Sequence, residues 1–92
     1  MDEAARLIVL KQDLQRLTTA NDDYLKTLMQ LAASEIQTEG ITLTEGEIES
    51  DMAVIQYAAY LFRKRAGNDT EMPRYLRRQL NNMLFSQKGK II

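Results

Sequence analysis

The sequence has no cysteine and no histidine among its 92 residues, and only one proline and four glycines. Without cysteine there is neither a disulfide framework nor thiolate chemistry, and without histidine the usual proton shuttle and the commonest metal ligand are missing. No apolar run approaches the roughly 20 residues of a membrane span, and Leu7 to Leu10 lacks the basic leader and the length of a signal peptide's apolar core. We therefore expect an unprocessed, soluble, intracellular protein without redox chemistry.

Charge is unevenly distributed along the chain. Residues 1–51 carry eleven Asp/Glu and four Lys/Arg, which gives a net charge of −7. Residues 52–92 carry two Asp/Glu and eight Lys/Arg, which gives a net charge of +6. A chain of this length makes one small domain, for which association with copies or partners often adds stability. The two halves either pair within one fold or present opposite charges to neighbouring copies.

Apolar residues recur at helical spacing almost from end to end, which predicts an all-α fold, a small four-helix bundle. The expected helices span about residues 3–17, about 22–39, from the Thr44–Glu47 segment to Gly67, and from Pro73 to about Phe85. Thr44 and Glu47 have the spacing of a capping box, and Gly40 and Gly67 supply helix stops. The third helix is apolar over a wide arc and should be central. We divide the chain into a helical domain, residues 1–85, and a short extended C-terminal tail, residues 86–92.

The pattern predicts no enzyme, and no catalytic, metal or cofactor site. The acids cluster at expected helix starts, where they stabilise the helix dipole rather than form a separated catalytic pair. The serines have no histidine partner, and no Gly-rich phosphate loop or calcium loop is present. The methionines fall mostly at apolar-stripe positions and are expected to fill the core.

Six of the twelve basic residues lie within sixteen positions around the proline: Arg63, Lys64, Arg65, Arg74, Arg77 and Arg78. The last three could contact phosphates, with Tyr75 available to stack on a base, as in a small helical DNA-binding or regulatory protein. Alternatively, the first three complement the dipole at the end of the third helix and reach acids of the same or an adjacent subunit. The acidic pI of about 5.4 favours the second interpretation.

Three segments together resemble the phage head–tail connector (adaptor) family. "LKQDLQRLTTANDDYLKTLMQLAASEI" (Leu10 to Ile36) is similar to the family's opening helices, and "AVIQYAAYLFRKR" (Ala53 to Arg65) to its central helix. "MPRYLRRQLNNML" (Met72 to Leu84) looks like its final helix, which also opens at a proline. The resemblance covers roughly residues 7–85, and its specificity comes from the order and spacing of the segments.

The resemblance implies a structural protein of the virion, assembled in the host cytoplasm and located at the head–tail junction. Its copies would form a ring, expected to be dodecameric, that docks on the portal protein and links it to the stopper or tail-completion protein. DNA would pass through the ring without sequence-specific binding. We expect the six basic residues to face neighbouring subunits and the portal, with these acids as partners: Glu45, Glu47, Glu49 and Asp51.

The C-terminal residues have two interpretations. Gly89 is expected to interrupt any helix continuing from Phe85, so that the following Ile pair belongs to no apolar stripe. The segment is either a flexible end or an extended strand that joins a sheet edge of the portal. For the second case the contact residues would be Lys88, Lys90, Ile91 and Ile92.

Overall fold

The computed structural model describes residues 1–15, 18–67 and 71–89 of the chain. These residues form four helices, in agreement with the predicted all-α fold: α1 (Glu3–Leu14), α2 (Asp22–Thr38), α3 (Ile48–Arg65) and α4 (Arg74–Gly89). None of the helices in this part of the chain combines the length and the apolar character needed to cross a membrane.

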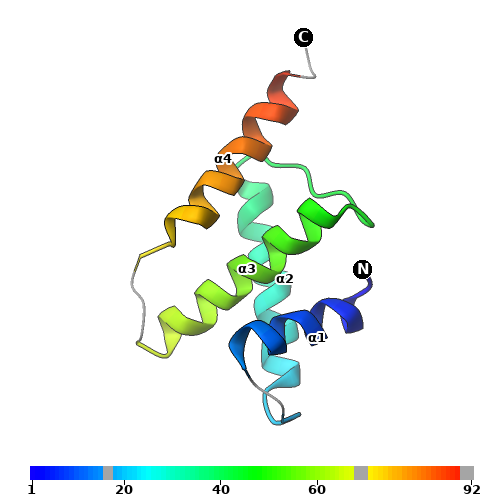
Figure 1. Ribbon diagram of the computed structural model, residues 1–92, viewed down its shortest axis with the longest axis vertical. Coiled ribbons are helices and arrows are strands. Elements are labelled where there is room, and N and C mark those ends of the chain that lie inside the picture. The colour runs from blue at the N-terminus through cyan, green and yellow to red at the C-terminus, as the bar shows by residue number, and fades with distance from the viewer. Residues whose placement is uncertain (16–17, 68–70, 90–92) are drawn as a thin grey trace.

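Helix α3 is central, as predicted, because it packs against each of the other three helices. In Figure 1 α3 runs diagonally between α1 and α4, and α2 passes behind it. The largest side chains with almost no exposed surface come from all four helices and from the loop after α2: Leu10, Leu25, Ile36, Ile41, Ile55, Leu76 and Leu80. One continuous core therefore holds the bundle together.

Local interactions explain several helix ends. The carboxylate of Asp2 accepts a hydrogen bond from the backbone N–H of Ala5 (2.8 Å) and caps α1. Asn21 occupies the N-cap position of α2, although its side chain makes no capping bond. Gly40 (φ +97°) and Gly67 (φ +81°) adopt the left-handed conformation just after α2 and α3, where a side chain would be strained.

Two expected helix boundaries are wrong. Helix α1 ends at Leu14 rather than near residue 17, because Gln15 adopts a left-handed conformation (φ 58°) and its N–H turns back to the carbonyl of Gln12. The Thr44–Glu47 capping box does not form. Glu47 is itself the N-cap of α3, and the backbone N–H of Thr44 donates instead to Ser50 Oγ (3.0 Å).

The expected end of the last helix, at about Phe85, is also wrong. Helix α4 continues to Gly89, so Ser86 to Lys88 are helical rather than part of an extended tail. The helix is held there by Gln87, whose side-chain amide accepts from the N–H of Thr42 and donates to its carbonyl, both at 2.7 Å. The remaining tail residues, Lys90 to Ile92, lie outside the described part of the chain.

Candidate interaction surfaces

Two of the six clustered basic residues already have acidic partners within the chain. Arg63, in the last turn of α3, lies 3.2 Å from the carboxylate of Asp13 near the end of α1. Arg77 of α4 donates two hydrogen bonds to Glu39 at the end of α2. Both arginines are half-buried and join the helices of one subunit. Their positive charges are therefore largely matched inside the fold.

Two further basic residues, both exposed, lie at the end of α3, and each is positioned over an aromatic ring. The ammonium group of Lys64 is 5.8 Å from the ring centre of Tyr60, and the guanidinium of Arg65 is 5.9 Å from that of Tyr24. At such distances the ring faces attract the cations, and at exposed sites the attraction is modest. These two side chains keep most of their hydrated charge available to a partner.

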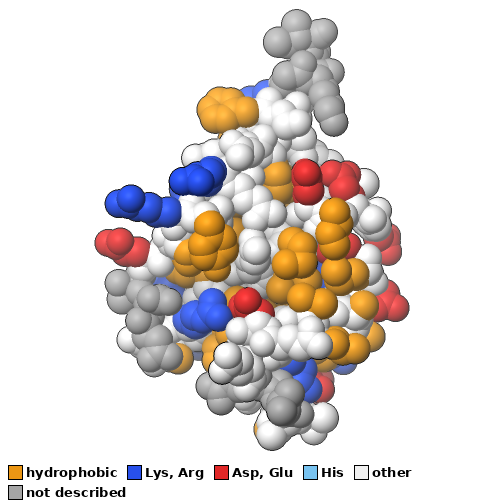
Figure 2. Space-filling view, viewed as in Figure 1, with side chains coloured by type: hydrophobic (Ala, Val, Ile, Leu, Met, Phe, Trp, Pro, Cys, Tyr) orange, Lys and Arg blue, Asp and Glu red, His pale blue; other side chains and the backbone are white. Residues whose placement is uncertain are grey.

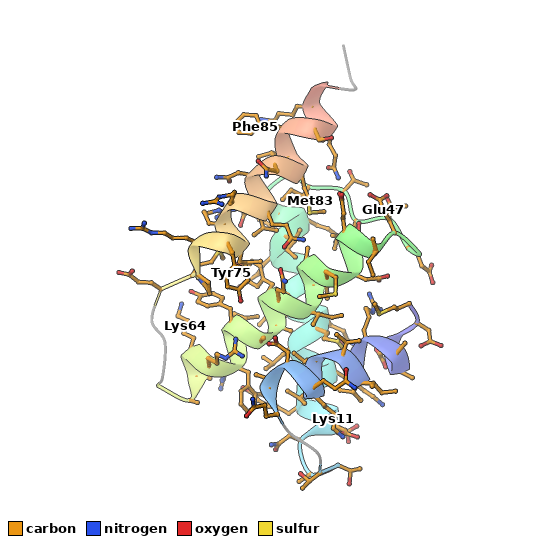
Figure 3. All side chains as sticks on the ribbon, viewed as in Figure 1. Lys11, Glu47, Lys64, Tyr75, Met83 and Phe85 are labelled. Atoms are coloured by element: carbon orange, nitrogen blue, oxygen red, sulfur yellow. The ribbon has the colours of Figure 1, made fainter. Side chains whose placement is uncertain are left out.

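The remaining two, Arg74 and Arg78, lie four positions apart on the exposed side of α4. They share this side with Tyr75, which is 53% exposed, and Phe85, which is 72% exposed. Figure 2 shows basic side chains at the left edge of the molecule over α4, and Figure 3 shows Phe85 projecting from the same helix. We call these four residues the basic aromatic face.

Of the four acids predicted as partners, Asp51 is engaged inside the chain. It is 3% exposed and lies 2.8 Å from the amino group of Met1 and 3.9 Å from Arg6 Nη1. Burial of a carboxylate is tolerated when such cationic partners offset the lost hydration. Its charge therefore serves the packing of α1 on α3.

The other three acids are exposed around the start of α3: Glu45, Glu47 and Glu49. Ile48 lies between them and is 58% exposed, which is unusual for a large aliphatic residue at the start of the central helix. In Figure 2 acidic side chains gather at the right edge of the molecule, opposite the basic edge. We call residues 45–49 the acidic segment.

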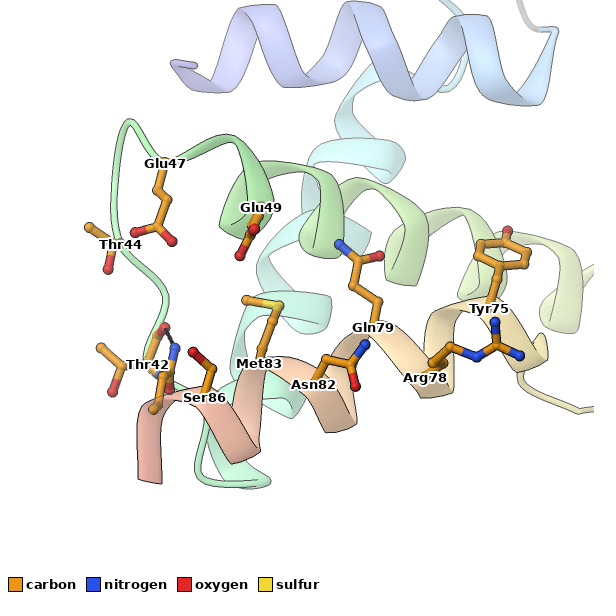
Figure 4. A pocket seen from close by; sticks show the side chains of 11 residues that line it. Thr42, Thr44, Glu47, Glu49, Tyr75, Arg78, Gln79, Asn82, Met83 and Ser86 are labelled. Atoms are coloured by element: carbon orange, nitrogen blue, oxygen red, sulfur yellow. Dashed lines mark hydrogen bonds between the residues drawn. The ribbon is translucent and has the colours of Figure 1, made fainter. Parts of the chain in front are cut away.

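A groove of about 630 Å³ separates α4 from the start of α3 and the preceding loop. Glu47 and Glu49 line one side, and Tyr75 and Arg78 lie toward its other end on α4, with Met83 between them (Figure 4). No ion pair joins Arg78 to either glutamate in the described structure. The structure thus brings predicted basic and acidic residues to one groove without letting them neutralise each other.

The sequence interpretation missed Phe85, Ile48 and Gln87. Phe85 lies on the side of α4 opposite the buried stripe of Leu76 and Leu80, so a helical projection of the sequence could have identified it. Nothing in the sequence marks Gln87, because its partner is the backbone of a residue 45 positions away.

The described residues contain no group of three or more acids placed to hold a metal ion. The pKa of Tyr57 lies above its usual value, mainly because burial disfavours the phenolate and also because of the nearby Glu35 side chain.

The tail residues predicted to contact the portal are divided between described and undescribed parts of the chain. Lys88 is exposed in the last turn of α4, whereas Lys90, Ile91 and Ile92 lie outside the described residues. Comparisons of the chain with protein families, curated proteins and solved structures find no match.

Proposed function

We propose that this protein is a structural component of a tailed-phage virion, a head–tail connector whose copies form a ring on the portal and link it to the stopper or tail. The proposal draws on the resemblance over residues 7–85. It is supported by the positions of the resembling segments, since Ala53–Arg65 forms most of α3 and Met72–Leu84 leads into and forms most of α4.

The observation that carries the proposal is the separation of unpaired charge across the molecule. Helix α3 has 18 residues and therefore spans about 27 Å. The exposed acids surround its first turn, whereas exposed basic residues lie at its last turn (Lys64 and Arg65) and on α4 (Arg74 and Arg78). Figure 3 places Glu47 and Lys64 on opposite sides of the molecule. A subunit of a cyclic ring needs two unlike surfaces on opposite sides, because each copy contacts the next head to tail.

The alternative, DNA binding through α4, is less well supported. Arg77 is bound to Glu39, so only Arg74, Arg78 and Lys88 of α4 remain for phosphates. Binding of DNA at physiological salt commonly rests on more phosphate contacts, about 6–10 in strongly salt-dependent cases. Glu47 and Glu49 also line the groove that Arg78 borders at its other end, and they would repel a duplex that entered the groove.

Electron microscopy of the protein mixed with the purified portal of the same phage tests the proposed function. We expect rings of this protein stacked coaxially on portal rings. In a parallel gel-shift titration over salt, we expect no binding of free DNA at physiological salt. Portal particles without an added ring would overturn the connector assignment, and DNA binding with a steep salt dependence would favour the alternative.

A matched pair of charge reversals sharpens this test. Lys64→Glu changes an exposed lysine at the end of α3, and Lys26→Glu reverses the charge of a half-buried lysine on α2, outside both charged surfaces. Charges at the rim of an interface mainly affect association rate and salt dependence. We expect Lys64→Glu to lower portal occupancy several-fold and Lys26→Glu to leave it unchanged, with equal helical content by circular dichroism. Equal occupancy for the two variants would exclude the end of α3 from docking.

A further inference from the structure

The exposed side of α4, which extends to the edge of the groove beside α3, has the composition of a protein-binding surface. Tyr75 and Phe85 are large and exposed, and Arg74 and Arg78 lie beside them without an acidic partner in the described chain. Aromatic residues and arginine are enriched at the centres of protein interfaces, where they contribute most of the binding energy. Residues 72–92 contain no Asp or Glu, so the charged side chains of α4 are all positive and favour an acidic partner.

The acidic segment of the same protein has the complementary composition. Ile48 provides an exposed aliphatic side chain, and Glu45, Glu47 and Glu49 surround it with negative charge. In such an interface, burial of the apolar side chains supplies affinity, and the opposite charges around them orient the two partners. A second copy of this chain therefore carries a surface that suits the basic aromatic face.

The two surfaces of one chain meet at the same groove but form no ion pair with each other in the described structure. Glu47 and Glu49 lie toward one end of the groove between α3 and α4, and Tyr75 and Arg78 lie toward the other end (Figure 4). We propose that the basic aromatic face of one copy receives the acidic segment of the next copy. This inference rests on the proposed ring, and it assigns the ring's contact between subunits to residues 45–49 and to one side of α4.

Two single charge reversals and their mixture test the contact. Arg78→Glu places a carboxylate opposite the acidic segment of the neighbour, and Glu47→Lys places an ammonium group opposite the basic aromatic face. Each variant alone should self-associate at least about tenfold more weakly than the wild type, because like charges meet at every contact. In an equimolar mixture, the carboxylate introduced in one variant meets the ammonium group introduced in the other, and the alternate contacts are native.

The mixture is the decisive sample, because a charge pair restored within one chain cannot explain rescue between two different chains. We expect sedimentation velocity to show self-association of the mixture close to that of the wild type. The control pair Lys26→Glu and Asp23→Lys, both on α2, should behave like the wild type separately and together. The same samples are then examined on portal rings by electron microscopy.

The possible outcomes separate the contact from the proposed function. Rescue in the mixture without portal binding would support the contact and overturn the connector function. Single variants that form wild-type rings on the portal, or a mixture that shows no rescue, would overturn the contact and leave the connector function standing. A wild-type chain that is monomeric both free and with the portal overturns both. If Arg78→Glu instead abolishes DNA binding and leaves association unchanged, the face binds nucleic acid and the contact is wrong.

Discussion

Phe85→Ala and Leu80→Ala are two truncations on the same helix with opposite expected effects. Leu80 has no exposed surface, and removal of such a leucine from a packed core costs about 2–5 kcal/mol of folding free energy. For a domain of this size each kcal/mol shifts the melting temperature by about 4–8 °C. We therefore expect Leu80→Ala to melt at least about 10 °C below the wild type.

Phe85 is 72% exposed, so little more than a quarter of its surface is covered within the chain. Complete burial of a phenylalanine is worth about 1.5–3 kcal/mol, which leaves about 0.4–0.8 kcal/mol to lose on truncation. Alanine has the higher helix propensity and returns up to about 0.5 kcal/mol of this loss. The folding free energy of Phe85→Ala should therefore stay within about 0.8 kcal/mol of the wild type.

Association should respond to Phe85→Ala even though folding does not. An aromatic anchor at the centre of an interface contributes about 2 kcal/mol or more, which corresponds to roughly thirtyfold in affinity. Circular dichroism melting measures the effect on folding, and sedimentation velocity measures the effect on association. A melting temperature lowered as far as in Leu80→Ala would place Phe85 in the core. Unchanged folding together with unchanged association would exclude Phe85 from the contact between copies.

Three further changes test local features of the fold. Gln87→Ala removes both hydrogen bonds to Thr42, and because the site is partly exposed we expect a loss of about 1 kcal/mol in urea unfolding. Gly67→Ala meets no atom within 4 Å but keeps a φ of +81°, so strain alone should cost about 1–2 kcal/mol, read from the urea midpoint. Tyr57 ionises in the unfolded chain near pH 10 but at higher pH in the folded chain, mainly because of burial and then because of Glu35. Its contribution is complete below about pH 10 and is lost as the pH rises further, so Tyr57→Phe should flatten the alkaline fall in stability.

The helices could be predicted because their determinants are local. The stripe of apolar residues in each helix, the acid at Asp2 and the glycines at 40 and 67 act through spacings of a few residues, which the sequence displays directly. The predicted start of α3 was wrong because two local hydrogen-bonding arrangements compete there. Thr44 has the spacing of a capping residue, but its N–H bonds to Ser50, and α3 begins after Glu47 instead.

The surfaces were only partly predictable, because pairing of charges depends on which helices meet. The sequence does not show which of these four arginines have acidic partners: Arg63, Arg74, Arg77 and Arg78. Only the packing of α3 beside α1 and of α4 beside the end of α2 gives Arg63 and Arg77 acidic partners. Asp51 resembles its acidic neighbours in sequence, yet it alone of the predicted partners is buried.

The Gln87–Thr42 pair has a geometric consequence for an assembly. Thr42 belongs to the loop that leads into the acidic segment, and Gln87 follows Phe85 by two positions on α4. Their two hydrogen bonds fix the position of one proposed contact surface relative to the other within each subunit. In a head-to-tail ring, the angle between those surfaces sets the rotation from each copy to the next, and therefore the number of copies at which the ring closes. A single glutamine side chain would then help to fix the curvature and the diameter of the ring.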